Sequence, residues 1–249
     1  IAGIVCETPL RRSSAFSDRV GADVYFKLEN RQHTGSFKLR GAANCLMTLS
    51  AEQRSAGCVA ASSGNHGAAV AFAATELGHA AHIYVPEFAG PAKIDVIRQT
   101  GATLHIVEGA YADAAAAAKT YQQDTGALDI HPYDAPATIA GQGTCFMEWE
   151  AQGLDADTVI VAIGGGGLIG GALAWFENRR VIGVETETTN AMHAALRHGP
   201  DTDVEVSGLC ANALGANVVA IDIPALRDRR EEVPLLVETF LSRYAALYG

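Results

Sequence analysis

Short apolar segments alternate with longer helical patterns over most of this sequence, and this alternation limits the possible folds more than any other feature. Apolar runs of four to six residues, typical of buried strands, occur at 58–61, 82–85, 103–107, 158–163 and 181–185. Helical spacing of apolar residues predicts helices at 38–49, 68–77, 91–100, 111–125, 140–152, 168–176 and 191–197. Strands separated by such helices form βαβ units and a parallel sheet. We therefore expect an α/β fold.

The composition favours a small-molecule site over a macromolecular partner. The chain has 249 residues, of which 49% are hydrophobic, so it can form one large or two small domains. Its formal net charge of -10 argues against nucleic acid and against an anionic membrane surface, because both bind clustered lysine and arginine. The uncharged stretch 159–176 contains six glycines, so we interpret it as a strand, a turn and a buried helix rather than as a membrane span.

The cysteines indicate a reducing compartment. Five cysteines are scattered along the chain without a CxxC pair, a pattern that predicts neither a disulfide framework nor a zinc site. Residues 1–10 show no basic region followed by an apolar run, so we expect no secretory signal. A cytoplasmic protein with reduced cysteines fits these features best.

One lysine stands at the predicted start of a helix between small residues. Residues 35–41 read Gly-Ser-Phe-Lys-Leu-Arg-Gly, and the lysine is Lys38. A lysine in such a place can be partly desolvated, which disfavours its charged form and leaves an amine that can attack a carbonyl or an aldehyde. The alternative is an ordinary surface lysine in the first turn, and this heptapeptide alone does not separate the two.

A glycine turn between a predicted strand and a predicted helix is the second candidate. Its residues are Gly164, Gly165, Gly166, Gly167 and Leu168. Consecutive glycines let several backbone N–H groups face one concavity, and the helix N-terminus adds positive potential, so the motif predicts a phosphate site. It is neither the dinucleotide fingerprint nor a P-loop, because the acidic strand end of the former and the Gly-Lys-Ser/Thr of the latter are missing. A tight turn without a ligand is the alternative.

A further strand-to-helix turn, residues 62–67, is rich in small polar groups. It reads Ser-Ser-Gly-Asn-His-Gly. Its hydroxyl, amide and imidazole groups can surround a carboxylate or a phenolate. The alternative is a helix N-cap, but one cap satisfies a helix and four polar residues are present.

In this order and separation, the lysine, the polar turn and the glycine turn closely resemble the serine/threonine dehydratase and serine racemase family. These are pyridoxal-phosphate enzymes of fold type II, which is related to the tryptophan synthase β subunit. The resemblance covers about residues 5–216. Its further motifs are Thr8-Pro9-Leu10, Lys27-Leu28-Glu29-Asn30, Pro91-Ala92-Lys93, Ile139-Ala140-Gly141-Gln142-Gly143-Thr144 and Ile182-Gly183-Val184-Glu185.

The resemblance implies how pyridoxal 5′-phosphate would be held. Lys38 would form an imine with its aldehyde, and Phe37 would wall its ring. Asn65 would hydrogen-bond the phenolic oxygen. The backbone of Gly164, Gly165, Gly166, Gly167 and Leu168 would hold the phosphate.

The resemblance also implies the catalytic and substrate-binding residues. Lys38, freed by the substrate amine, would remove the α-proton as general base. The groups that would contact the substrate are Ser62, Ser63, Asn65 and His66. Ser63, on the opposite face of the ring, could return a proton to the α-carbon, which would make the enzyme a racemase.

For the fold, the resemblance implies two open, twisted, mostly parallel sheets flanked by helices, with a smaller domain inserted in the larger. Residues 1–56 and 136–249 would form the large cofactor-binding domain, and residues 57–135 the small domain with the substrate loop. The proline-dense segment 131–136 is the predicted crossover. Related enzymes are usually dimers, so we expect a homodimer.

Two features of the family lack a counterpart here. The segment whose hydroxyl or thiol meets the pyridine nitrogen is not found after Cys210. Some members bind a divalent cation through a glutamate, a nearby carbonyl and an aspartate. The glutamate corresponds to Glu185, but the aspartate position is Ala191, which has no ligand atom in its side chain. We therefore expect no metal site, and we interpret Glu185 as a strand-end carboxylate.

The leading hypothesis is a lyase that converts a β-hydroxy amino acid, such as L-threonine or L-serine, to a 2-oxo acid and ammonia. An amino-acid racemase on the same scaffold is one alternative. The other, from a different class, is a protein that keeps the fold without catalysis and binds some other phosphate in the glycine turn.

Overall fold

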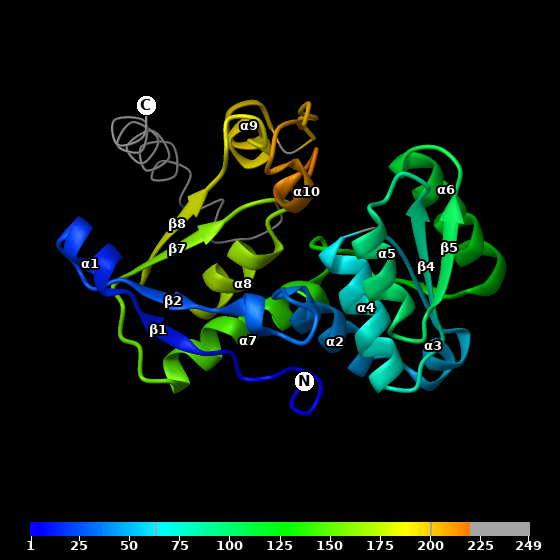
Figure 1. Cartoon of the computed structure of the whole chain (residues 1–249), viewed down its shortest axis with the longest axis horizontal. Coiled ribbons are helices and arrows are strands. Elements are labelled where there is room, and N and C mark those ends of the chain that lie inside the picture. The colour runs from blue at the N-terminus through cyan, green and yellow to red at the C-terminus, as the bar shows by residue number, and fades with distance from the viewer. Residues whose placement is uncertain (63, 200, 220–249) are drawn as a thin grey trace. The chain divides into compact units, whose positions relative to one another are not determined.

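The computed structural model describes residues 1–62, 64–199 and 201–219 (Figure 1). They form two compact units. Unit 1 consists of Ile1–Pro132 and Met147–Gly153, and unit 2 of Tyr133–Phe146 and the described residues from Leu154 onward. Both units combine helices with parallel strands, which confirms the expected α/β class. The domain boundaries that the sequence suggests, with residues 57–135 as the small domain, stay a prediction.

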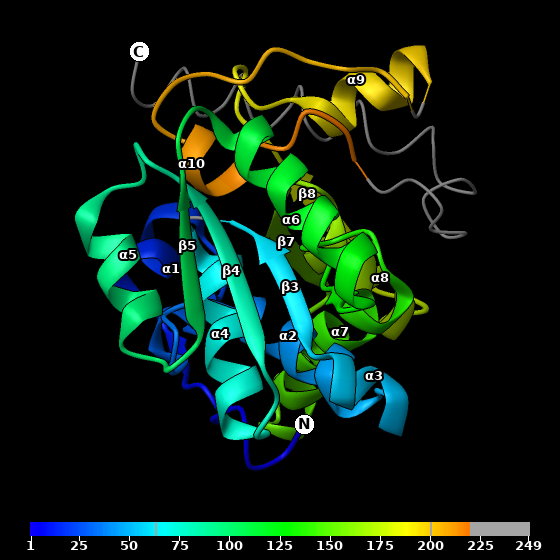
Figure 2. The same cartoon turned by 90° about the vertical axis from the view of Figure 1, so that its right-hand side faces the viewer.

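Unit 1 is built on a four-stranded parallel sheet with the strand order β5-β4-β3-β6. The strands are β3 (Cys58–Ala61), β4 (Ala81–Pro86), β5 (Thr103–Val107) and β6 (Leu128–Asp129). Figure 2 shows β5, β4 and β3 side by side. The connecting helices are α4 (Asn65–Glu76), α5 (Pro91–Arg98) and α6 (Tyr111–Thr125).

Helices cover both faces of this sheet. Neighbouring residues of a strand point to opposite sides, so each strand contributes side chains to both faces. On β3 and β4, Val59 and Tyr84 pack with Ala114 and Ala118 of α6. Ile83, the neighbour of Tyr84, lies against Gly67 of α4. Helices α4 and α6 therefore lie on opposite faces, as right-handed crossovers require.

Helix α2 (Lys38–Met47) packs against α4 through small and branched side chains. Leu39, Ala43 and Leu46 on α2 are completely buried, as are Val70 and Ala74 on α4. The alanine-rich sequence of α4 thus serves close helix packing, and Lys38, the first residue of α2, is half-buried.

The N-terminal segments of unit 1 form short elements. A short antiparallel pair, β1 (Leu10–Arg12) and β2 (Tyr25–Lys27), is joined by α1 (Ser14–Val20). The short elements η1 (Glu29–Arg31) and α3 (Ala51–Ala56) follow. Helices α1 and α3 have too few turns to show a clear apolar period, although α3 begins with a Ser50 capping box.

Unit 2 contains a parallel pair of strands, β7 (Thr158–Ala162) and β8 (Arg180–Val184), connected by α8 (Gly167–Trp175). Among the described residues after Pro132, the other helices are α7 (Pro136–Ala151), whose last residues belong to unit 1, α9 (Ala191–His198) and α10 (Ala211–Leu214). Helices α7 and α8 approach so closely that a Cβ on Gly171 would stand 2.5 Å from the backbone nitrogen of Gly143. These two glycines let the two helices lie close together.

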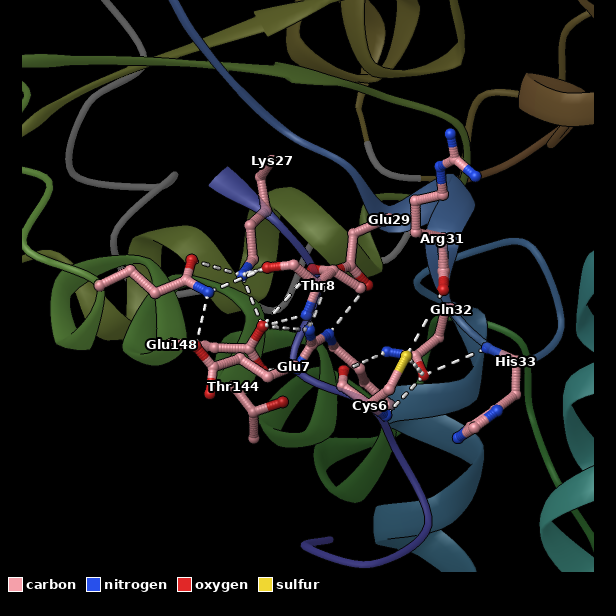
Figure 3. A network of polar contacts seen from close by, with 12 residues as sticks. Cys6, Glu7, Thr8, Lys27, Glu29, Arg31, Gln32, His33, Thr144 and Glu148 are labelled. Atoms are coloured by element: carbon pink, nitrogen blue, oxygen red, sulfur yellow. Dashed lines mark hydrogen bonds and ion pairs between the residues drawn. The ribbon is translucent and has the colours of Figure 1, made fainter. Parts of the chain in front are cut away.

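A buried ionic network ties the start of α2 to the rest of unit 1 (Figure 3). The guanidinium of Arg40, which is 1% exposed, donates to Glu29 at 2.8 and 2.9 Å and to Glu148 at 2.9 and 3.0 Å. Lys27 Nζ donates to Glu148 at 2.5 Å and to the Thr8 carbonyl at 2.8 Å. Two cations thus face two anions, which balances the buried charge.

The network also sets the ionisation of Glu148. Burial alone would raise the pKa of this carboxyl, but hydrogen bonds from Arg40 and Lys27 outweigh burial and lower the pKa. A glutamate whose pKa is lower in the folded state contributes stability at neutral pH, and it loses that contribution only as the pH falls through its folded pKa.

Removing the central cation should therefore destabilise unit 1 strongly. Arg40→Met leaves two buried carboxylates facing one lysine, and we expect the free energy of unfolding to fall by about 3–5 kcal/mol. Arg12→Met is the matched control, because the Arg12–Asp23 pair is exposed, and its loss should leave the free energy of unfolding almost unchanged. Urea unfolding at neutral pH measures both, and equal losses would contradict the importance of the network.

Candidate active site

Lys38 opens helix α2 directly after a sharp turn. Gly35 adopts a positive φ of 73°, a conformation that favours glycine. Phe37 then begins the helical path with a φ of -59°. This geometry directs the Lys38 amine to the carbonyl oxygen of Pro132, to which Nζ donates at 2.8 Å. The same nitrogen lies 5.3 Å from the centroid of the Phe37 ring.

Burial changes the chemistry of this amine. Desolvation lowers the pKa of Lys38 from 10.5 to about 8. At pH 7, roughly one amine in ten is then neutral, far more than for a lysine in water. The structure thus favours the reactive alternative over an ordinary surface lysine.

His66 lies near Lys38, and both side chains donate hydrogen bonds to the backbone of residues 130–132. Its Nε2 donates to the Ile130 carbonyl at 2.6 Å, two residues before the carbonyl that Lys38 contacts. Burial, with the positive charge of Lys38 as a second cause, lowers the pKa of His66 to about 3. The imidazole is therefore neutral, and its Nε2 already has a backbone partner. That it also binds substrate stays a prediction.

The polar turn after β3 is tighter than its sequence suggested. Helix α4 begins at Asn65 rather than at residue 68, and the side chain of Asn65 is exposed. Ser62 Oγ accepts from the Gly64 N–H at 3.2 Å. A Cβ on Gly67 would collide with the Ser62 carbonyl, so the turn requires that glycine. Ser63 lies outside the described residues.

Two buried hydroxyls beside Lys38 were given no role from the sequence. Ser36 Oγ and Thr34 Oγ1 have no hydrogen-bond partner among the described residues. A buried polar atom without a partner is costly, which is why such atoms often belong to ligand sites. In the sequence, only their position, two and four residues before Lys38, could have indicated that they belong to the site.

Gln142, in unit 2, is a similar case. It is 1% exposed, and neither amide atom has a partner among the described residues. It belongs to the motif at 139–144, which is part of the family resemblance but for which no role was predicted.

The glycine turn lies in unit 2, at the carboxyl end of β7. Gly166, with a φ of 92°, caps α8, and the helix begins at Gly167, one residue earlier than predicted. The first N–H groups of a helix have no partner within the helix, so Gly167 and Leu168 contribute to an anion-binding end.

The turn is also closely packed by Tyr133, a residue that the sequence analysis missed. A Cβ on Gly165 would collide with the Tyr133 ring, and a Cβ on Gly167 would lie 3.0 Å from its Cα. On Gly164, a Cβ would lie 3.2 Å from the Leu214 Cα. In the sequence, only its aromatic side chain and its place in the proline-dense segment could have indicated a role for Tyr133.

The structure therefore groups the predicted residues in two sets. Phe37, Lys38 and His66 belong to unit 1, together with Ser62 and Asn65 of the polar turn. The glycine turn, Gly164 to Leu168, belongs to unit 2.

Glu185 caps a helix. Its carboxylate, 5% exposed, accepts from the N–H groups of Met192 at 2.7 Å and His193 at 2.9 Å, at the start of α9. Burial raises the pKa of Glu185 to about 7, and these two hydrogen bonds oppose the rise. Both oxygens are thus engaged by backbone, and Ala191 supplies no ligand. The described residues hold no group of three or more His, Cys, Asp or Glu arranged to bind a metal.

Comparison with known proteins identifies the family. The model of the pyridoxal-phosphate dependent enzyme family matches residues 1–237. The chain belongs to this family. L-threonine ammonia-lyase of Geobacter sulfurreducens is 38% identical over 94% of the chain and 60% of the relative, and that of Thermotoga maritima is 42% identical over 82% and 52%. The chain thus spans only part of the length of these relatives.

Solved structures of family members show the same fold. The processed form of threonine deaminase isoform 2 from Solanum lycopersicum matches with a TM-score of 0.84 and 33% identity, over 89% of this chain and 66% of that one. Maize serine racemase matches with a TM-score of 0.81 and 34% identity, over 94% and 70%. The resemblance stated from the sequence motifs, and the fold and cofactor family that it implied, are thereby confirmed.

The residues present fit the family cofactor. Pyridoxal phosphate needs an amine for its aldehyde and donors for its phosphate. Lys38 offers an amine whose pKa is lowered by burial, two residues after Ser36, whose hydroxyl has no hydrogen-bond partner in the described part of the chain. The glycine turn offers the N-terminus of α8.

The lowered pKa predicts how Lys38 reacts with amine reagents. In the cofactor-free protein, its labelling rate should rise with pH and reach half its maximum near pH 8, because only the neutral amine attacks. Peptide mass spectrometry after brief acylation at a series of pH values measures this rate. The exposed Lys119 gives an internal reference in each sample. A midpoint above pH 10 would contradict the desolvation of Lys38.

Proposed function

We propose that this chain carries the site of a pyridoxal-phosphate-dependent ammonia-lyase that acts on a β-hydroxy amino acid, L-threonine or L-serine. The substrate loses water across its α and β carbons, and hydrolysis of the product gives a 2-oxo acid and ammonia. The observation that carries the proposal is the Lys38 amine, whose pKa burial lowers to about 8, in a chain with relatives named L-threonine ammonia-lyase. Because the chain spans only part of the length of these relatives, the activity of the whole protein is part of this proposal.

Lys38 would act twice. Its Nζ holds the aldehyde of the cofactor, which when bound supplies an electron sink for the α-carbon. Once the substrate amine takes its place, the neutral Nζ accepts the α-proton, a task for which a base with a pKa near neutrality is suited. The Pro132 carbonyl, which accepts from Nζ, orients the amine.

The other residues would bind and orient. The exposed amide of Asn65 would bind the phenolic oxygen of the cofactor, and Phe37, whose ring lies beside Lys38 Nζ, would wall its ring. Ser62, Ser63 and His66 would face the substrate carboxylate. The backbone N–H groups of Gly164, Gly165, Gly166, Gly167 and Leu168 would hold the phosphate.

A racemase is the second candidate. The match to maize serine racemase favours it, because that structure resembles this chain almost as closely as the threonine deaminase does. In a racemase, Ser63 would return the proton to the opposite face of the α-carbon. Formation of the D-amino acid separates this activity from release of a 2-oxo acid.

We also propose a cytoplasmic homodimer without a metal, nucleic acid or membrane partner. The five scattered cysteines, without a CxxC pair, are typical of a reducing compartment. The helix-capping role of Glu185 supports the absence of a metal. In the described part of the chain, no helix has the length and apolar character needed to cross a bilayer. Light scattering of the purified protein tests the dimer.

The decisive variant is Lys38→Ala. We expect it to lose at least about a thousandfold in 2-oxo acid and ammonia release from L-threonine or L-serine, because both the attachment point and the base are removed. Its far-ultraviolet circular dichroism should stay unchanged. Lys119→Ala, on the surface of α6, is the control and should keep full turnover.

A different outcome would favour the non-catalytic alternative. If the unaltered protein shows no turnover on a panel of β-hydroxy amino acids with added pyridoxal phosphate, and Lys38→Ala leaves its phosphate binding unchanged, the protein is a phosphate-ligand-binding member of the fold.

A further inference from the structure

Tyr133 packs directly against the glycine turn. The three atoms nearest to a Cβ built on Gly165 are Cδ1, Cγ and Cε1 of the Tyr133 ring, and all three collide with it. The ring therefore lies on the side of Gly165 where any other residue would carry its side chain. The Tyr133 hydroxyl donates to the Val218 carbonyl at 3.1 Å, which fixes the far end of the ring.

Backbone conformation does not explain this glycine. Of the four glycines in the turn, only Gly166 has a positive φ. An alanine at 165 would therefore meet no backbone strain, and its obstacle is the tyrosine ring. The usual explanation of a glycine-rich turn, close approach of a phosphate to the backbone, is not needed at this position.

The neighbouring glycines meet obstacles of a different kind. A Cβ on Gly167 would lie 3.0 Å from both Cα and Cβ of Tyr133 and 3.2 Å from its carbonyl oxygen. A Cβ on Gly164 would lie 3.2 Å from the Leu214 Cα. These are mostly backbone atoms, which remain whatever side chain stands at 133. Only at Gly165 does the obstacle consist of side-chain atoms that a substitution can remove.

We propose that Tyr133 is a positioning residue of the cofactor's phosphate site, and that residue 165 is a glycine in order to accept its ring. This rests on the proposed function, since it assigns the turn to the phosphate of pyridoxal phosphate. The ring covers one side of the turn and keeps water from its peptide groups, so that their N–H donors bind a phosphate more strongly.

A double-mutant cycle tests the proposal. The full chain is compared with Tyr133→Ala, Gly165→Ala and the double variant, and the Kd for pyridoxal phosphate is measured by equilibrium dialysis and by the visible absorbance of the bound cofactor. We expect Gly165→Ala to weaken binding by about a hundredfold and Tyr133→Ala by about tenfold, since both disturb the turn. In the double variant, binding should return to within about threefold of Tyr133→Ala, because the added methyl then has room.

Two controls separate this role from general damage. Gly167→Ala should not be rescued by Tyr133→Ala, because Cα, Cβ and the carbonyl of residue 133 are still present. Tyr133→Phe keeps the ring and should bind pyridoxal phosphate within about threefold of the unaltered protein. The same variants are unfolded thermally without cofactor, so that a Gly165→Ala chain that folds poorly still reveals rescue as a regained Tm.

The outcomes distinguish a failure of the role of Tyr133 from a failure of the proposed function. If the unaltered protein binds pyridoxal phosphate but Gly165→Ala is equally harmful with Tyr133 and with alanine at 133, the phosphate itself requires the glycine, and this inference alone fails. If Tyr133→Phe binds as poorly as Tyr133→Ala, the hydroxyl rather than the ring matters, which also overturns it. If the unaltered protein does not bind pyridoxal phosphate, the proposed function fails together with this role.

Discussion

The proposed chemistry depends on the burial of one amine. Lys38 begins a helix that packs into the interior of unit 1, and the Pro132 carbonyl accepts a hydrogen bond from its Nζ. Desolvation then lowers the pKa of the amine to about 8, within reach of neutral pH. Nearby, the same burial keeps His66 neutral. A lysine at the surface would not have its pKa lowered in this way, so the packing of α2 against α4 is a condition for reactivity.

The position of that helix is fixed by charge as well as by apolar contact. Arg40, two residues after Lys38, binds two carboxylates in a network that also includes Lys27. Paired buried charges are not in themselves a large source of stability, but their geometry is demanding, and a helix held by bidentate contacts has little freedom to shift. We infer that the network keeps the first turn of α2, and with it Lys38, in one place.

The fold and the principal motifs could be predicted from the sequence because they depend on local patterns. Apolar runs gave β3, β4, β5, β7 and β8, and glycine-rich or polar turns marked the helix starts that follow them. Helix starts were wrong by three residues at Asn65, where α4 begins inside the polar turn, and by four at Pro136, where α7 begins at the last proline of the proline-dense segment. The partners of Lys38 and Gly165 could not be predicted, because Pro132 and Tyr133 are distant in sequence and their contacts depend on how the chain closes. The same is true of Glu148, which joins Arg40 from a position 108 residues away.

The central claim is that Lys38 is the residue to which pyridoxal phosphate attaches. The most direct test is to reduce the purified protein with borohydride in the presence of pyridoxal phosphate, digest it and map the modified peptide by mass spectrometry. We expect a stoichiometric phosphopyridoxyl group on Lys38 and little on any other lysine. A reduced protein without modification at Lys38, or with the group on another amine, would contradict this attachment.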